Sequence, residues 1–153
     1  MRTITSKGIL WAACAMAMLI VGCGSPQGIP TEFANACDPG NEKKTIEISG
    51  VLEQRGSVFC SNTGGRMECG FDLLEAPGSD RKVRVDIEQG SGANTVDKLE
   101  RGYKTEDVRI RDNNGSQVVI GTDKLKLTGK MNVVAPMGNA QGICFMQVYK
   151  IEK

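Results

Sequence analysis

The sequence predicts a mainly β fold, a small five-stranded barrel with one short helix between the third and fourth strands. Several stretches alternate apolar and polar residues, which is typical of strands with one wet face. Clusters of Gly, Pro and Asn separate these stretches, as turns do. Only after Gly90 does the apolar spacing change from two to three or four, which favours a helix. Another small closed barrel or a β-sandwich is the alternative.

The first predicted strand spans Thr45–Glu53. Ile46, Ile48 and Leu52 fall on one face and alternate with polar residues. Gly50 in its middle indicates a bulge or a sharp bend, which would let the strand curve around a small barrel.

Met67–Leu73 and Lys82–Glu88 are the second and third predicted strands, separated by the Pro77-Gly78 turn. We expect an inward face of Met67, Cys69, Phe71, Leu73, Val83, Val85 and Ile87. We expect a wet face of Glu68, Gly70, Asp72, Arg84, Asp86 and Glu88.

A short helix is predicted next, with Asn94 as its cap, Asp97 in its first turn and Gly102 at its end. Val96, Leu99 and Tyr103 would share its buried face. Val108–Arg111 and Gln117–Ile120 then flank Asp112–Gly115, whose Asn-Gly pair predicts a hairpin turn.

The last two predicted strands are Lys124–Met131 and Cys144–Glu152. In the first, Leu125 and Leu127 point inward and the lysines outward. Both faces of the second carry apolar side chains, so its register stays open.

The first residues have the charged-then-apolar order of a secretory signal, with Arg2 and Lys7 before the apolar run Gly8–Gly22. That run of fifteen residues is short for a transmembrane helix. Ile20-Val21-Gly22-Cys23 resembles the bacterial lipobox. The resemblance implies cleavage between Gly22 and Cys23 and lipidation of Cys23. Gly24, where inner-membrane lipoproteins carry Asp, implies sorting to the outer membrane, facing the periplasm.

These motifs divide the chain into a signal peptide (1–22), a lipidated cysteine with a flexible tether (23–42) and a β domain (43–153). Residues 24–36 are rich in Gly, Pro and small polar residues, and we expect order to begin at Cys37 or Pro39. Two or three acyl chains would make the membrane anchor permanent.

Four cysteines remain after the predicted cleavage and lipidation: Cys37, Cys60, Cys69 and Cys144. An even set in an exported domain indicates two disulfides, for which three pairings exist. We favour Cys60 with Cys69 across a glycine turn, and Cys37 with Cys144. A zinc site is the alternative, but the sequence has no C-x₂-C spacing. We expect neither a metal nor a cofactor.

Three strands, a helix and two strands with a small extra hairpin is the order of an oligonucleotide/oligosaccharide-binding (OB) barrel. Ser49-Gly50-Val51, Lys126–Lys130 and Val148–Glu152 resemble the corresponding strands of OB domains in bacterial envelope proteins. The resemblance covers about residues 43–153 and implies a ligand-binding face on strands two and three. Those strands carry carboxylates outward and few aromatic residues, so nucleic acid is not an expected partner.

Charge is unevenly distributed after residue 22. Residues 23–97 carry seven basic and twelve acidic side chains, and residues 98–153 carry ten basic and six acidic ones. Strand alternation would gather several cations on one face, a candidate site for an anionic ligand. Its predicted members are Arg109, Arg111, Lys124, Lys126, Lys130 and Lys150.

No catalytic constellation stands out. The sequence has no His to activate a Ser or Thr, and the carboxylate pairs Asp72/Glu75 and Asp86/Glu88 are expected in solvent. We therefore expect no enzyme, but a binding module for an envelope protein or an anionic envelope component. The alternatives are a structural or stress-related lipoprotein without a dedicated ligand, and an envelope hydrolase that depends on Asp72 or Asp86.

Overall fold

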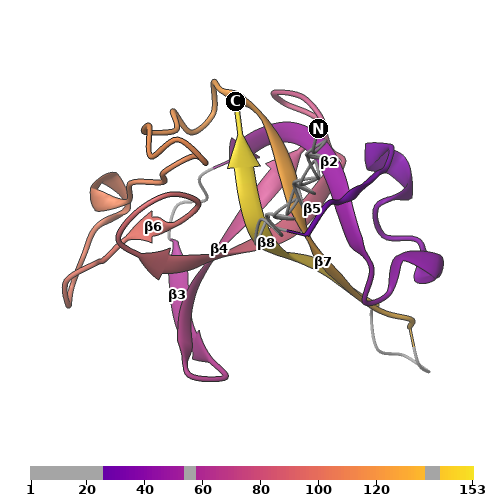
Figure 1. The fold of residues 1–153 in the computed structure, drawn as a ribbon, viewed down its shortest axis with the longest axis horizontal. Helices are drawn as coiled ribbons and strands as arrows, with labels where there is room; N and C mark the ends of the chain where they lie inside the picture. Colours follow the sequence, from indigo (N-terminus) through magenta and orange to yellow (C-terminus); the bar gives the residue numbers. More distant parts are fainter. Residues whose placement is uncertain (1–25, 54–57, 137–141) are drawn as a thin grey trace, which may run out of the picture.

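The computed structural model describes residues 26–53, 58–136 and 142–153, and their fold is mainly β, as predicted. Five strands form a closed ring in the order β2-β4-β5-β8-β7 and back to β2 (Figure 1). Their bounds are β2 Thr45–Glu53, β4 Arg66–Leu74, β5 Lys82–Gly90, β7 Lys124–Val134 and β8 Ile143–Glu152. Such a ring belongs to the class of small β-barrels and sandwiches that the alternation indicates.

All neighbours in the ring are antiparallel except β5 and β8, which are parallel. The ring encloses the core, because the inward side chains of each strand are apolar and buried. These include Ile46, Ile48, Leu52, Leu73, Val85, Ile87, Leu125, Leu127, Met131, Met146 and Ile151.

Gly50 lies next to the point where the two pairings of β2, with β7 on one edge and with β4 on the other, overlap. β2 pairs with β7 from Thr45 to Val51 and with β4 from Val51 to Glu53. The β2–β7 register runs on through Gly50, so the glycine marks a bend and not a bulge. A Cβ there would lie 2.3 Å from the carbonyl oxygen of Leu74, so only glycine lets β4 approach this closely.

The bulge lies instead between β7 and β8. Thr128 pairs with Lys150 and Gly129 with Val148, which leaves Tyr149 as the extra residue. Because the alternation changes phase at Tyr149, Val148 and Ile151 both point inward and are buried. This settles the register of the last strand.

A further strand, β3 (Phe59–Thr63), pairs with the first half of β4 through the turn at Gly64 and Gly65. Met67, expected in the core, is 41 % exposed because this end of β4 continues into the β3 hairpin.

The prediction of a solvent-exposed outer face on β4 is wrong at Glu68 and Asp72. Glu68 and Asp72 are only 7 % and 5 % exposed, because each packs against a long polar side chain from another strand. Glu68 accepts a hydrogen bond of 2.6 Å from Gln147 Nε2, and Asp72 forms an ion pair of 3.2 Å with Lys82.

The predicted helix is wrong. Residues 91–107, all of them described, contain β6 (Val96–Asp97) and the 3₁₀ turn η3 (Thr105–Asp107) but no α-helix. Asn94 adopts a left-handed backbone with φ 60°, so it does not cap a helix. Val96 is buried as expected, but as a strand residue opposite Gln89 and Ile110.

The hairpin turn at Asp112–Gly115 is confirmed. Asp112 accepts the Gly115 N–H through its carbonyl oxygen, and Arg111 bridges to Gln117 beyond the turn. The segments that flank the turn form isolated bridges and not extended strands.

The packed chain begins earlier than Cys37. β1 (Ile29–Pro30) pairs in parallel with Ile46 and Glu47, and so covers the part of the β2 edge that β4 leaves open. The 3₁₀ turns η1 (Phe33–Asn35) and η2 (Pro39–Asn41) follow, and Ala36 between them is fully buried.

Candidate functional site

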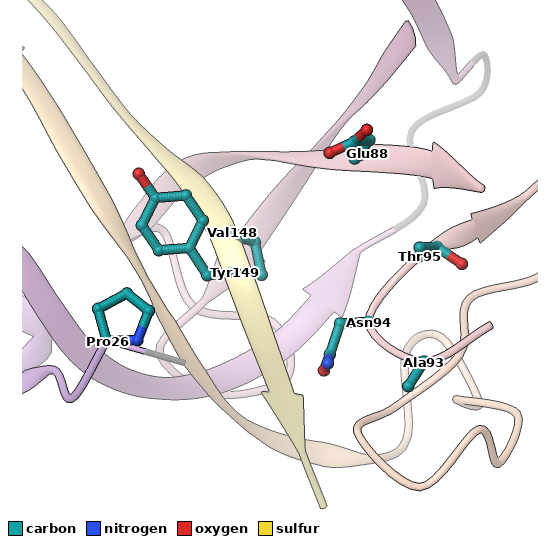
Figure 2. A pocket seen from close by; sticks show the side chains of 7 residues that line it. All are labelled: Pro26, Glu88, Ala93, Asn94, Thr95, Val148 and Tyr149. Atoms are coloured by element: carbon teal, nitrogen blue, oxygen red, sulfur yellow. The ribbon is translucent and has the colours of Figure 1, made fainter. Parts of the chain in front are cut away.

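The described chain starts on the outside of the ring, beside β8. A cavity of about 390 Å³ there is lined by Pro26, Glu88, Val148, Tyr149 and residues 93–95. Figure 2 shows the ring of Tyr149 close to Pro26, with Glu88 and the 93–95 loop on the other side. Tyr149 follows the inward residue Val148 and lies outside, and the bulge places Lys150 outside as well.

A second cavity of about 350 Å³ shares Pro26 and holds a charge network. Lys126 Nζ lies 3.5 Å from Glu47 and 3.1 Å from Glu152, and Lys150 Nζ lies 2.8 Å from Glu152. We call the lining of both cavities the Pro26 face. Its residues are Pro26, Gln27, Gly28, Glu47, Glu88, Ala93, Asn94, Thr95, Lys126, Thr128, Val148, Tyr149, Lys150 and Glu152.

The hydrogen bonds of this network stabilise the charged forms of Glu152 and Lys126. Hydrogen bonds from Lys150 and Lys126 lower the pKa of Glu152, and the Glu152 hydrogen bond raises the pKa of Lys126. Two cations and two carboxylates, counting Glu47, therefore compensate one another on the outer faces of β2, β7 and β8.

The predicted basic residues are thus placed in different settings. Lys126 and Lys150 come together on Glu152. Arg111 donates two hydrogen bonds to Asp97, of 3.0 and 2.8 Å, and lowers the pKa of that carboxyl.

The remaining three are separate from this network. Arg109 donates to the carbonyl oxygens of Val108, at 3.0 Å, and Glu106. Among the described ion pairs, none involves Lys124 or Lys130 at the two ends of the β7 lysine row.

A second surface is the ribbon of β3 and the start of β4, residues 59–69, which projects from the sheet (Figure 1). Phe59 is 70 % exposed, and residues 59–65 carry no charge. β3 pairs only with β4, so its other edge faces no described strand. β3 was not predicted from the sequence because its residues are mostly polar and do not alternate with apolar ones. The two cysteines on either side of Gly64-Gly65 were the signal for a hairpin.

Both expected disulfides are present. Cys37 is bonded to Cys144 and Cys60 to Cys69, with Cα atoms 5.7 and 4.0 Å apart. Among the described residues, no three His, Cys, Asp or Glu side chains gather as a metal site would require.

The carboxylates considered for catalysis each have a cation nearby. The pairs are Asp72 with Lys82 at 3.2 Å, Glu75 with Arg81 at 3.1 Å, Asp86 with Arg84 at 3.2 Å and Glu88 with Arg66 at 3.8 Å. Asp72 and Asp86 lie on the same side of β4 and β5, next to Arg84.

Ile20–Cys23, with the predicted cleavage site after Gly22 and the predicted lipidation site at Cys23, lie outside the described residues. Within the described part, no helix has the length and apolar character needed to cross a membrane. Comparison with protein-family models, curated proteins and solved structures finds no match to this chain.

Proposed function

We propose that this protein is a bacterial envelope lipoprotein, held in the outer membrane by lipidated Cys23 and facing the periplasm. Its domain would be an OB-type module that binds an envelope protein. The lipobox Ile20–Cys23 supports the anchor. The ring order supports the OB assignment, because its strands, numbered along the chain, follow the sequence 1-2-3-5-4-1.

The free edge of β3 is the observation that carries the choice of partner. Cys60 and Cys69 have Cα atoms 4.0 Å apart, as in a non-hydrogen-bonded pair. The backbone N–H and C=O of Cys60, and by alternation those of Asn62, therefore point to the free edge. Proteins usually protect such edges with charges or Pro, and this edge has neither.

An extended segment of a partner protein can add to this edge as a further strand, with exposed Phe59 as an apolar anchor. The Cys60–Cys69 bond holds the two strands together, since an isolated hairpin is only marginally stable. An anionic component has less support, because Glu47 and Glu152 compensate Lys126 and Lys150.

Crosslinking in intact cells tests the partner site. Asn62→Pro removes the N–H at the free edge, while Asn62→Ala keeps it, and both remove the side-chain acceptor of the Gly65 N–H. We expect a specific protein captured by the wild type and Asn62→Ala, and lost with Asn62→Pro and Phe59→Ala. Equal capture by all variants excludes the β3 edge, and no specific capture favours a structural lipoprotein without a dedicated ligand.

The anchor has its own test. We expect Cys23→Ser to abolish palmitate labelling and to release the protein from the membrane fraction. Continued labelling of the Ser variant would exclude the lipobox assignment.

A further inference from the structure

We propose that the Pro26 face rests on the lipid headgroups of the membrane that anchors the chain. This inference depends on the proposed lipidation of Cys23. It concerns the orientation of the domain on the membrane, whereas the β3 edge concerns its partner.

The first step is the length of the connection. Pro26 follows Cys23 by three residues, which span roughly 10 Å even when fully extended. A tether that reached residue 42 would have spanned several times more. Because the packed chain begins near Pro26, the domain cannot move far from the level of its lipid.

The second step is the packing of the residues after Pro26 against the sheet. Thr31 N donates to the Glu47 carbonyl oxygen at 2.9 Å, and β1 pairs with Ile46 and Glu47. At Gly28 an added Cβ would lie 2.8 Å from Thr128 Cγ2. This close approach keeps the chain on the sheet, so Pro26 stays beside Tyr149 and the cavity that they line.

The third step is the chemistry of the surface. Tyr149 combines an apolar ring with a hydroxyl, which suits the boundary between headgroups and water. Lys126 and Lys150 are balanced by Glu47 and Glu152, so the contact does not depend on anionic lipid. The anchor supplies the high local concentration that makes a weak contact effective.

This orientation would leave the free edge of β3 accessible. Glu88 of the Pro26 face contacts Arg66 of the ribbon at 3.8 Å, but Arg66 belongs to β4, and the free edge is on the side of β3 that faces away from β4. In Figure 1 the tip of the ribbon projects from the sheet away from β2, on whose edge β1 lies. A partner could then reach the β3 edge while the Pro26 face is on the membrane.

Single tryptophans test the orientation, because the only Trp of the sequence, Trp11, leaves with the predicted signal. Lipidated Tyr149→Trp and its control Phe59→Trp are reconstituted into phosphatidylcholine vesicles that carry a nitroxide quencher on the lipid headgroups. We expect the Tyr149→Trp emission to shift to the blue and to lose most of its intensity, in low and high salt alike. Phe59→Trp should keep its intensity.

A long Gly-Ser linker inserted between Ser25 and Pro26 tests the length argument and should restore the Tyr149→Trp intensity. The mass of each purified protein reports cleavage and lipidation separately. An unlipidated chain contradicts the proposed function. A lipidated chain in which Tyr149→Trp is unquenched, or Phe59→Trp is quenched as strongly, overturns the orientation and leaves the lipoprotein assignment standing.

Discussion

Among single residues, Asn94 connects three parts of the molecule. Its Oδ1 accepts a 2.7 Å hydrogen bond from the N–H of Ile151, and its own N–H donates to the Asp112 carbonyl at 3.1 Å. The left-handed backbone, which Asn tolerates better than most residues, allows both contacts. Asn94 thus fastens the 91–95 loop to the last strand and to the hairpin turn.

We expect Asn94→Ala to lower the free energy of unfolding by about 2 kcal/mol, since the Ile151 N–H loses its acceptor and Ala is strained at this φ. Asn94→Gly is the matched control, because it loses the same bond without the strain. Urea unfolding should rank wild type above Gly and Gly above Ala. Equal stability of the two variants would show that the backbone conformation contributes nothing.

Among the elements, β2 requires a glycine at position 50, next to the overlap of its pairings with β7 and β4. Gly50 leaves room for the Leu74 carbonyl oxygen, which a methyl group would meet at 2.3 Å. Val51, the next residue, pairs with Lys124 of β7 on one edge of β2 and with Leu74 of β4 on the other, so this close approach lies where the two pairings of β2 overlap.

Gly50→Ala should therefore lower the melting temperature strongly, with a loss of about 2 kcal/mol or more, because β4 or β2 must move to admit the methyl group. Gly40→Ala is the control, since no atom lies within 4 Å of its Cβ position. Calorimetry of both variants measures the difference. A Gly50→Ala protein as stable as Gly40→Ala would show that the strands adjust freely.

At the scale of the whole molecule, the two disulfides act over different distances. Cys37 and Cys144 are separated by 107 residues, and Cys60 and Cys69 by 9. The first joins the packed N-terminal segment to the start of β8, whereas the second stays within one ribbon.

Chain entropy predicts about 5 kcal/mol of stabilisation from the long loop and about 3 kcal/mol from the short one. We expect the Cys37→Ala/Cys144→Ala double variant to unfold at lower denaturant than Cys60→Ala/Cys69→Ala. Guanidinium titrations of both compare them directly. The reverse order would indicate that the ribbon contributes more to the fold than its short loop suggests.

The pH dependence of stability also belongs to the whole molecule. The chain has no His, and Asp97, Asp123 and Glu152 have pKa values lowered mainly by hydrogen bonds from Arg111, Val119 N–H and Lys150. A lowered pKa contributes stability that is present above the unfolded value, 3.8 or 4.5, and is lost as pH falls through the folded value.

We therefore expect a plateau of melting temperature from about pH 5 to 8 and a fall below about pH 4. Asp97→Asn should flatten part of the acid fall, because it removes one of the titrating groups. Melting curves across this pH range measure both effects. A transition inside the plateau would contradict the assignment.

Much of the ring could be predicted from the sequence because period-two alternation is a local signal. β2 has the predicted bounds, and β4, β5, β7 and β8 lie within one to three residues of theirs. Where the pattern was broken by long-range contacts, prediction failed or stayed open. The helix from Asn94 became a loop and a short strand because Gln89 and Ile110 pair with Val96.

By itself, the sequence determined the strand segments and the apolar face of most strands, because alternation is a local pattern. It favoured the cysteine pairing that the structure shows, but left two other pairings open. It also contains Ile20–Cys23, whose resemblance to a lipobox motivates the proposed anchor. Only the tertiary structure decided that residues 26–36 pack on the sheet, that Lys126 and Lys150 are compensated, and that β3 has a free edge. These features join residues far apart in the chain, so no local pattern could reveal them.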